Sequence, residues 1–287
     1  MDKLKGEAQA LIVAPPFYTL TSPSLAAHLL QACARAAGFE VKVLYANLSL
    51  AAVIGQENYE RISVTHTNGL PGERLFAASA YGLPPLGYEP EQMRDVEALR
   101  QASYDDPRQM WLMELLPCGL DLPALTRLEA IARTWVDETA LSIARQGFSV
   151  VGCTTTFQQT AASVALLKRV KQLAPQTVTI IGGANCAGDM AQGVSALSPA
   201  IDYVFSGEAE ITFPDFLRRV ATGQLPGERI IYGQPCADLA AIPTPDFAEL
   251  YEQLEQYLPT LAARADSLKL PYEGSRGCWW GQKHPCT

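Results

Sequence analysis

Short apolar segments alternate with amphipathic ones at the start of the chain. Ala10–Ala14 is an apolar run typical of a buried parallel strand, and it ends at two prolines. Leu25, Leu29 and Leu30 then recur at helical spacing, and Val41–Ala46 is a second strand-like run. This order predicts a βαβ unit, which favours a parallel sheet with helices on its faces.

The alternation lapses after Val41–Ala46 and returns at Ser149. Three more strand-like runs follow, and each is succeeded by a turn and a helical pattern, while Arg229–Tyr232 resembles a minor edge strand. We therefore expect an α/β fold, a flavodoxin/Rossmann-like doubly wound sheet of five parallel strands in the order 2-1-3-4-5. Ligands of such sheets bind at the carboxyl ends of the strands. The three later strands are Ser149–Cys153, Val178–Ile181 and Tyr203–Phe205.

Residues 48–146 interrupt this pattern, and a structureless loop of that length is improbable inside a domain. We predict a mainly helical insertion whose longest helix, Leu122–Arg145, packs on the sheet. The expected domains are residues 8–236 for the sheet with its insertion, 237–266 for a proline-containing linker with a helix, and 267–287 for the start of a further domain that begins with a strand at Leu268–Tyr272.

The net charge of −8 and the absence of a long basic run argue against nucleic acid or an anionic membrane as partner. The first ten residues lack the apolar core of a secretory signal, and no apolar stretch is long enough to span a membrane. The seven cysteines are odd in number and show no disulfide spacing. We expect a cytoplasmic protein.

The loops after the predicted strands are rich in Gly, Thr, Ser and Asn, which let a large ligand approach the backbone and offer it hydrogen bonds. No Gly-x-Gly-x-x-Gly follows the first strand, and no acidic cluster ends it, which counts against a dinucleotide fingerprint and a receiver domain. A nucleotide-like or otherwise bulky cofactor remains, and flavin is not excluded. The candidate binding residues are Thr19, Leu20, Ser22, Thr154, Thr155, Thr156, Phe157, Gln158, Gly182, Gly183, Ala184, Asn185, Gly207 and Glu208.

The last fourteen residues carry a second kind of chemistry. Cys278 and Cys286 flank a Gly- and Trp-rich loop, and thiolates suit iron–sulfur or zinc sites, for which His284 is a further candidate ligand. The segment Glu-x-Ser-Arg-Gly-Cys, then seven residues and a cysteine, resembles the cluster loop of radical S-adenosylmethionine (SAM) enzymes. Its Cys-Trp-Trp-Gly-x-Lys-His part resembles the cobalamin-dependent C-methyltransferases that mature ribosomally synthesised peptides. The three turns after the later strands resemble the cobalamin-binding domain of that group.

The resemblance implies cobalamin, held without histidine because the usual Asp-x-His-x-x-Gly signature is absent, with its nucleotide tail beside Gly182, Gly183, Gly207 and Glu208. It implies a [4Fe-4S] cluster on Cys278, Cys286 and a third cysteine beyond the chain, together with SAM, a precursor peptide substrate and an electron donor. One SAM would methylate reduced cobalt, and a second would generate the radical that activates an unactivated carbon for methylation. We therefore expect the front part of a longer enzyme, inactive in isolation.

Several alternatives stay open on the sequence. A flavodoxin-like module could carry a corrinoid or a flavin without catalysing a reaction, and a cobalamin-dependent radical SAM cyclase would share these features. Cys153 and Cys186 are expected to be inert buried thiols, and Trp279 and Trp280 either shield the cofactor or anchor their loop. The catalytic residues are not identified.

Overall fold

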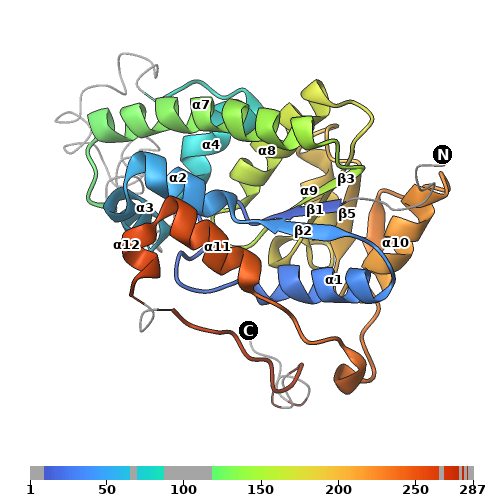
Figure 1. Cartoon of the computed structure of the whole chain (residues 1–287). Helices are drawn as coiled ribbons and strands as arrows, with labels where there is room; N and C mark the ends of the chain where they lie inside the picture. Colours follow the sequence, from blue (N-terminus) through green and yellow to red (C-terminus); the bar gives the residue numbers. More distant parts are fainter. Residues whose placement is uncertain are drawn as a thin grey trace, which may run out of the picture.

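The computed structural model describes residues 10–64, 70–86, 118–264 and 268–277, together with residues 280 and 283. Its centre is a parallel sheet with the strand order β2-β1-β3-β4-β5-β6 (Figure 1). The strands are β1 (Ala10–Val13), β2 (Val41–Leu44), β3 (Val150–Thr154), β4 (Val178–Gly182), β5 (Tyr203–Ser206) and β6 (Ile230–Tyr232).

The central strands are apolar on both faces because helices cover both, as expected for a parallel sheet. Ile12 of β1 is in register with Val43 on one side and Gly152 on the other. The order expected for five strands is present, but the sheet has six. The count of five is corrected to six because Ile230–Tyr232, the predicted minor edge strand, pairs with β5 as the edge of the same sheet.

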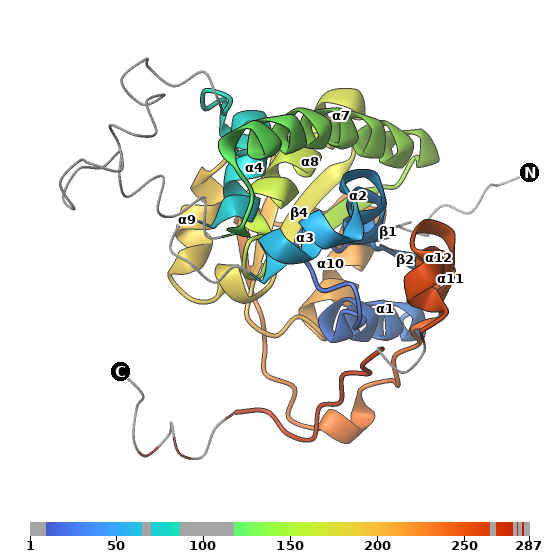
Figure 2. The same ribbon diagram turned by 90° about the vertical axis from the view of Figure 1, so that its left-hand side faces the viewer.

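The two faces of the sheet carry different helices. On one side α1 (Leu25–Ala36) contacts α10 (Thr212–Ala221), and on the other lie α8 (Thr160–Leu173), α4 (Pro71–Tyr81) and α7 (Leu122–Gln146) (Figures 1 and 2). Further helices are α2 (Ala46–Ile54), α3 (Gln56–Ser63), α9 (Met190–Ala196), α11 (Ala248–Tyr257), α12 (Pro259–Ala262) and two short 3-10 helices at Ala184–Cys186 and Leu239–Ala241.

The insertion is helical in the residues described, since α2, α3, α4 and α7 all fall within or at the edge of residues 48–146. The bounds of α7 agree closely with the predicted helix, because the Asp121 carboxylate accepts a hydrogen bond from Ala124 N and Gly147 ends the helix in a left-handed conformation. Its expected packing on the sheet is corrected. Helix α7 contacts α8, α4 and α2 and forms a layer outside them.

The helix predicted after the linker is α11 (Ala248–Tyr257), and it covers the free edge of β2. Glu249 Oε2 accepts a hydrogen bond from Val43 N at 2.8 Å. Gln253 Oε1 accepts one from Tyr45 N at 2.8 Å, and Gln253 Nε2 donates to Val43 O at 2.9 Å. Two side chains one helical turn apart thus replace the missing neighbouring strand. This protects an edge that would otherwise be open to pairing with another chain.

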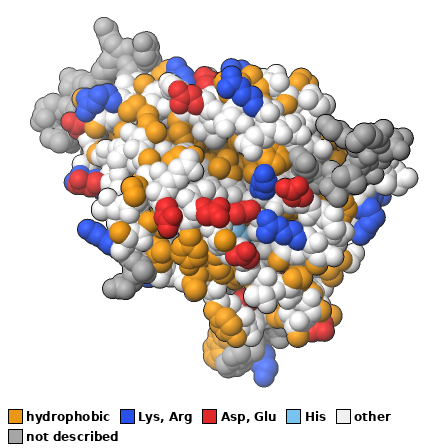
Figure 3. Space-filling view, viewed as in Figure 1, with side chains coloured by type: hydrophobic (Ala, Val, Ile, Leu, Met, Phe, Trp, Pro, Cys, Tyr) orange, Lys and Arg blue, Asp and Glu red, His pale blue; other side chains and the backbone are white. Residues whose placement is uncertain are grey.

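We expect Glu249→Ala to lower the free energy of unfolding by about 1–3 kcal/mol, because it leaves the half-buried Val43 N–H without an acceptor. Glu249 also pairs with Arg35 at 3.1 Å, and acidic side chains gather over α11 with basic ones beside them (Figure 3). Urea unfolding measures the effect. Glu252→Ala, which removes the same charge from an exposed position of α11, is the control. Equal losses in the two variants would show that charge, and not edge coverage, is responsible.

His28 lies fully buried in α1 at the centre of a hydrogen-bonded chain. Its Nδ1 is 2.9 Å from Gln31 Oε1, which can only accept, so the proton is on Nδ1. Its Nε2 accepts from the Tyr45 hydroxyl at 2.8 Å, and that hydroxyl accepts from Ser24 N at 2.9 Å. Burial lowers the pKa of His28 below its ordinary value, against the opposing influence of Gln31 and Glu249.

The pKa of His28 is lower in the folded protein than in the unfolded chain, where it is near 6.5. As the pH falls, His28 is therefore protonated in the unfolded state before it is protonated in the folded state. Stability contributed by this site is present above about pH 6.5 and falls as the pH drops below it. Urea midpoints of the wild type between pH 5 and 7.5 should show this loss, and those of His28→Gln should show less of it. Parallel pH profiles of the two proteins would contradict the assignment.

The segment after α12 does not form the strand expected at Leu268–Tyr272. Residues 268–277 run without a strand ladder, because no neighbouring strand pairs with them in the described part of the chain. Lys269 N donates to Thr21 O at 2.8 Å, which places this segment beside the loop that follows β1. Among the residues described, no helix combines the length and apolar character needed to cross a membrane.

Candidate functional site

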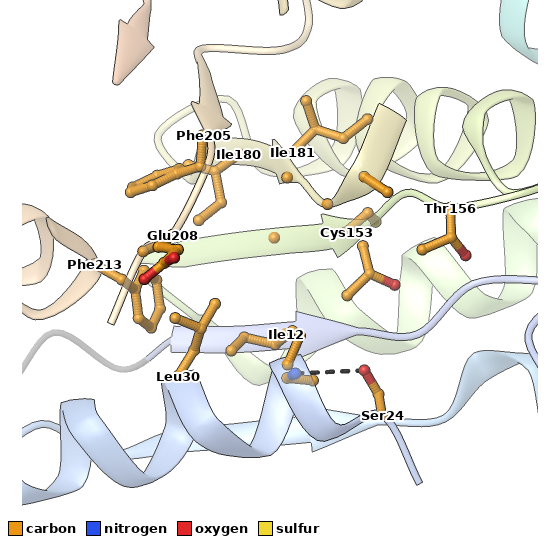
Figure 4. Close-up of a pocket in the computed structure, with 18 of the residues that line it drawn as sticks. Ile12, Ser24, Leu30, Cys153, Thr156, Ile180, Ile181, Phe205, Glu208 and Phe213 are labelled. Carbon is orange, nitrogen blue, oxygen red and sulfur yellow. Dashed lines mark hydrogen bonds between the residues drawn. The ribbon is translucent and has the colours of Figure 1, made fainter. Parts of the chain in front are cut away.

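A cavity of about 380 Å³ lies between one face of the sheet and helices α1 and α10. Figure 4 shows Leu30 of α1 and Phe213 of α10 across the space from Ile180 and Phe205 of the sheet, with Glu208 beside it. Most of the lining is apolar. The lining residues are Ile12, Tyr18, Ser24, Ala26, Ala27, Leu30, Gly152, Cys153, Thr154, Thr156, Ile180, Ile181, Gly182, Gly183, Ala184, Phe205, Gly207, Glu208, Ala209, Glu210 and Phe213.

Small residues keep this space open. A Cβ at Gly152 of β3 would lie 2.7 Å from the Ile180 side chain, so a larger residue there would displace Ile180. On the opposite wall, α1 contributes two more small residues, Ala26 and Ala27. Protein interiors are normally packed without voids of this size. A cavity lined by small residues at this position is therefore a candidate ligand site.

Two polar atoms of the lining residues have no protein partner. The Thr154 hydroxyl and Glu210 Oε2 are both buried and unbonded within the described structure. Nearly all buried polar atoms in proteins are hydrogen-bonded, so such atoms at a cavity are candidates to receive a ligand. An apolar slot with a few polar atoms suits a flat, largely apolar group better than a highly charged metabolite.

Backbone groups of the helical insertion hold the turn after β3 through hydrogen bonds to Gln158. Gln158 is 2 % exposed, and its Oε1 accepts from Gly72 N at 2.8 Å while its Nε2 donates to Ile62 O at 3.1 Å. Gln159 Oε1 accepts from both the backbone N–H and the hydroxyl of Thr156, at 2.9 and 2.6 Å. Gln158 is thus engaged with backbone, and Thr156 is held at the cavity rim.

The turns after β3 and β4 approach each other closely. Gly183 has a φ of +126°, and a Cβ there would lie 2.3 Å from Thr155 O. Thr155 N donates to Gly182 O at 2.7 Å, and Asn185 Nδ2 donates to Thr156 O at 2.5 Å. Only glycine fits at position 183 without displacing the neighbouring turn.

A wider groove of about 670 Å³ adjoins the cavity at the carboxyl edge. The loop after β1 forms one side, the end of α3 another, and Thr156 with Phe157 a third. Tyr18 and Thr156 line both hollows, so the groove and the cavity are neighbours. Phe157 is half exposed there.

The structure brings most of the predicted binding residues to these two hollows. The cavity is lined by Thr154, Thr156, Gly182, Gly183, Ala184, Gly207 and Glu208, and the groove by Thr19, Leu20, Thr156 and Phe157. Ser22, Thr155, Gln158 and Asn185 line neither. Thr155, Gln158 and Asn185 instead hold the turns together through protein contacts.

Sequence reasoning missed the apolar walls of the cavity, namely Leu30, Ile180, Phe205 and Phe213, because their pattern is that of ordinary core residues. It also missed Arg276. The available signal was Gly152, because a glycine inside a buried strand often marks a close approach of another group.

Arg276 of the terminal segment reaches the turn after β5. Its Nη1 donates to Glu208 Oε2 at 2.8 Å, and its Nη2 donates to Glu210 Oε1 at 2.5 Å. Glu273 accepts from Nε and Nη2, both at 2.9 Å. The Cys236 N–H and Arg276 lower the pKa of Glu208, so this carboxylate is ionised at neutral pH. The segment that leads to Cys278 is therefore tied to the edge of the cavity.

The predicted metal ligands Cys278 and Cys286 lie outside the described residues, as do His66 and His284. In the part of the chain that is described, no group of three or more His, Cys, Asp or Glu side chains could hold a metal ion. Cys153 and Cys186 are buried free thiols, and burial raises the pKa of both, that of Cys186 to about 12. Such thiols are protonated and poor nucleophiles at neutral pH.

Comparison of the chain with protein-family models, with curated proteins and with solved structures gave no match in any of the three. The chemistry of the site therefore has to be argued from its residues and geometry.

Gly183→Ala should destabilise the protein by roughly 2–4 kcal/mol, since it combines a disfavoured φ with a clash against Thr155 O. Gly193→Ala is the matched control, because Gly193 lies in α9 with open space around its Cβ position. That change should be neutral or stabilise by about 0.5–1 kcal/mol. Thermal and urea unfolding of both variants test the expectation, and a tolerated Gly183→Ala would contradict the close approach of the two turns.

Proposed function

We propose that the chain is the cobalamin-binding part of a radical SAM C-methyltransferase that methylates unactivated carbons of a ribosomally synthesised peptide. The observation that carries the proposal is the apolar cavity between the sheet and helices α1 and α10, which adjoins a wider groove at the carboxyl edge. Seven of the residues expected from the sequence to contact the cofactor line that cavity.

The sizes of the two hollows suit the two parts of cobalamin. A cavity of about 380 Å³ can take a flat heterocycle with its sugar, but a corrin ring is too broad for it. The groove of about 670 Å³ is more open and lies beside it, sharing Tyr18 and Thr156. In this proposal the nucleotide tail enters the cavity and the corrin lies across the edge.

The polar groups of the cavity support the same assignment. The buried hydroxyl of Thr154 can donate to or accept from the ligand, and the apolar side chains around it exclude water. Bound cobalamin would supply the methyl group that the reaction transfers. His28 uses one ring nitrogen with Gln31 of α1 and the other with Tyr45, so its lone pair is not free for cobalt.

The radical SAM part of the proposal rests on the terminal segment. Cys278 and Cys286 are the proposed cluster ligands, and SAM, the peptide and the electron donor belong to the same proposal. Its support within the described structure is the contact of Arg276 with Glu208 and Glu210, which ties the beginning of that segment to the cavity. A methyltransfer of this kind needs the two cofactors to lie near each other.

Titration of the purified chain with hydroxocobalamin, followed by its visible spectrum and by equilibrium dialysis, tests the cofactor. We expect saturable binding of one cobalamin per chain. Ala26→Trp, at an exposed position on the cavity rim, should weaken binding by about tenfold or more because the indole fills the space. Ala52→Trp, at an exposed position of α2, is the matched control and should bind as the wild type does.

Absence of cobalamin binding, or equal binding by Ala26→Trp and the wild type, would contradict the proposed site. Purification of the chain with a yellow chromophore whose absorption is that of a flavin would favour the flavodoxin-like alternative. For a protein extended beyond residue 287, iron and sulfide analysis tests the cluster, and zinc without sulfide would remove the radical SAM assignment.

A further inference from the structure

Arg276 occupies a position with an excess of negative charge. Its guanidinium is surrounded by Glu208, Glu210 and Glu273, so one positive charge meets three carboxylates. Its side chain is only 18 % exposed, and three of its nitrogens donate. Bidentate ion pairs that are largely shielded from water are stronger than ordinary surface ion pairs.

Two of these carboxylates belong to the cavity as well. Glu208 and Glu210 line it, and Glu210 Oε2 is buried without a partner while Oε1 is held by Arg276. Without Arg276 the rim would carry two uncompensated negative charges at the entrance to the proposed nucleotide site. The nucleotide tail of cobalamin contains a phosphodiester, and like charges repel strongly in a partly buried site.

The same arginine positions the terminal segment. Described residues 268–277 are hydrogen-bonded to the rest of the protein by Lys269 N, which donates to Thr21 O, and by Arg276, which donates to Glu208 and Glu210. Arg276 therefore contributes both to docking of the segment and to the charge of the cavity rim.

We propose that Arg276 is a positioning residue that couples the two sites: its single positive charge offsets part of the negative charge of Glu208 and Glu210, which docks the segment that leads to Cys278 and lets the cavity accept a phosphate-bearing cofactor. This inference rests on the proposed function, because it takes cobalamin as the ligand of the cavity. Linkage then requires that docking and cofactor binding favour each other by the same factor.

The test compares hydroxocobalamin affinity in the wild type, Arg276→Gln and the control Lys269→Gln. Lys269 is exposed in the same segment, and its loss removes an equal charge away from Glu208 and Glu210. We expect Arg276→Gln to weaken binding by about tenfold at low salt, with a smaller effect at high salt, and Lys269→Gln to leave it unchanged. Hydrogen exchange of residues 268–277 should be faster in Arg276→Gln than in either other protein, even without cobalamin.

A triple variant, Arg276→Gln with Glu208→Gln and Glu210→Gln, separates charge neutralisation from simple support of the fold. It should regain affinity to within about threefold of the wild type, because the repelling carboxylates are gone, while exchange of residues 268–277 stays fast. Equal affinity of Arg276→Gln and the wild type, or no recovery in the triple variant, would overturn the coupling while leaving cobalamin binding intact. Failure of the wild type to bind cobalamin would instead remove the proposed function.

Discussion

Hydrogen bonds between the turns at the carboxyl edge of the sheet fix the geometry of the candidate site. The strands bring the turns to one edge, and the turns are also bonded to one another: Thr155 N donates to Gly182 O, and Gln159 Nε2, after β3, donates to Pro15 O, after the adjacent strand β1. These bonds satisfy backbone groups that a ligand would otherwise have to satisfy. They also leave the cavity below the edge open, because the turns are stable without filling it. The site is therefore preformed, which reduces the entropy cost of binding.

The helical insertion supports the turn between β3 and α8 from outside the sheet. Glu73, at the start of α4, accepts hydrogen bonds from Thr160 N at 2.9 Å and Ala161 N at 2.5 Å, and so caps the N-terminus of α8 in place of a local side chain. Burial raises the pKa of Glu73, and the two backbone donors oppose that shift. Next to it, Gly72 N donates to Gln158. Residues some 90 positions apart thus hold the β3–α8 turn from outside, which explains why this turn can keep Gln158 in a left-handed conformation at a φ of +59°.

The sequence allowed the sheet order, the bounds of α7 and the glycine turns to be predicted, because each depends on local periodicity or on a residue with special backbone freedom. The run at Ile230–Tyr232 indicates only a minor edge strand and is not counted among the five, since a three-residue run carries little pattern. The cavity could not be predicted from the sequence for a different reason. Leu30, Phe205 and Phe213 are core residues by every local criterion, and only the fit of α1 and α10 onto Gly152 leaves space between them. Gln158 was expected at the ligand, but its partners Gly72 and Ile62 lie in an insertion whose packing has no local signal.

The route of the terminal segment follows from the position of α11. This helix lies against β2 at one edge of the sheet, whereas β5 lies near the opposite edge, so the chain leaves α11 far from β5. Lys269 is bonded beside the loop after β1, and Arg276 beside the turn after β5, three strands away. Three strand spacings are about 14 Å, and seven residues of extended chain reach about 23 Å, so the segment can cross the carboxyl edge without stretching. A ligand at the mouth of the cavity must therefore share the carboxyl edge of the sheet with this segment. The residues that follow Arg276 in the sequence continue from a point beside the turn after β5.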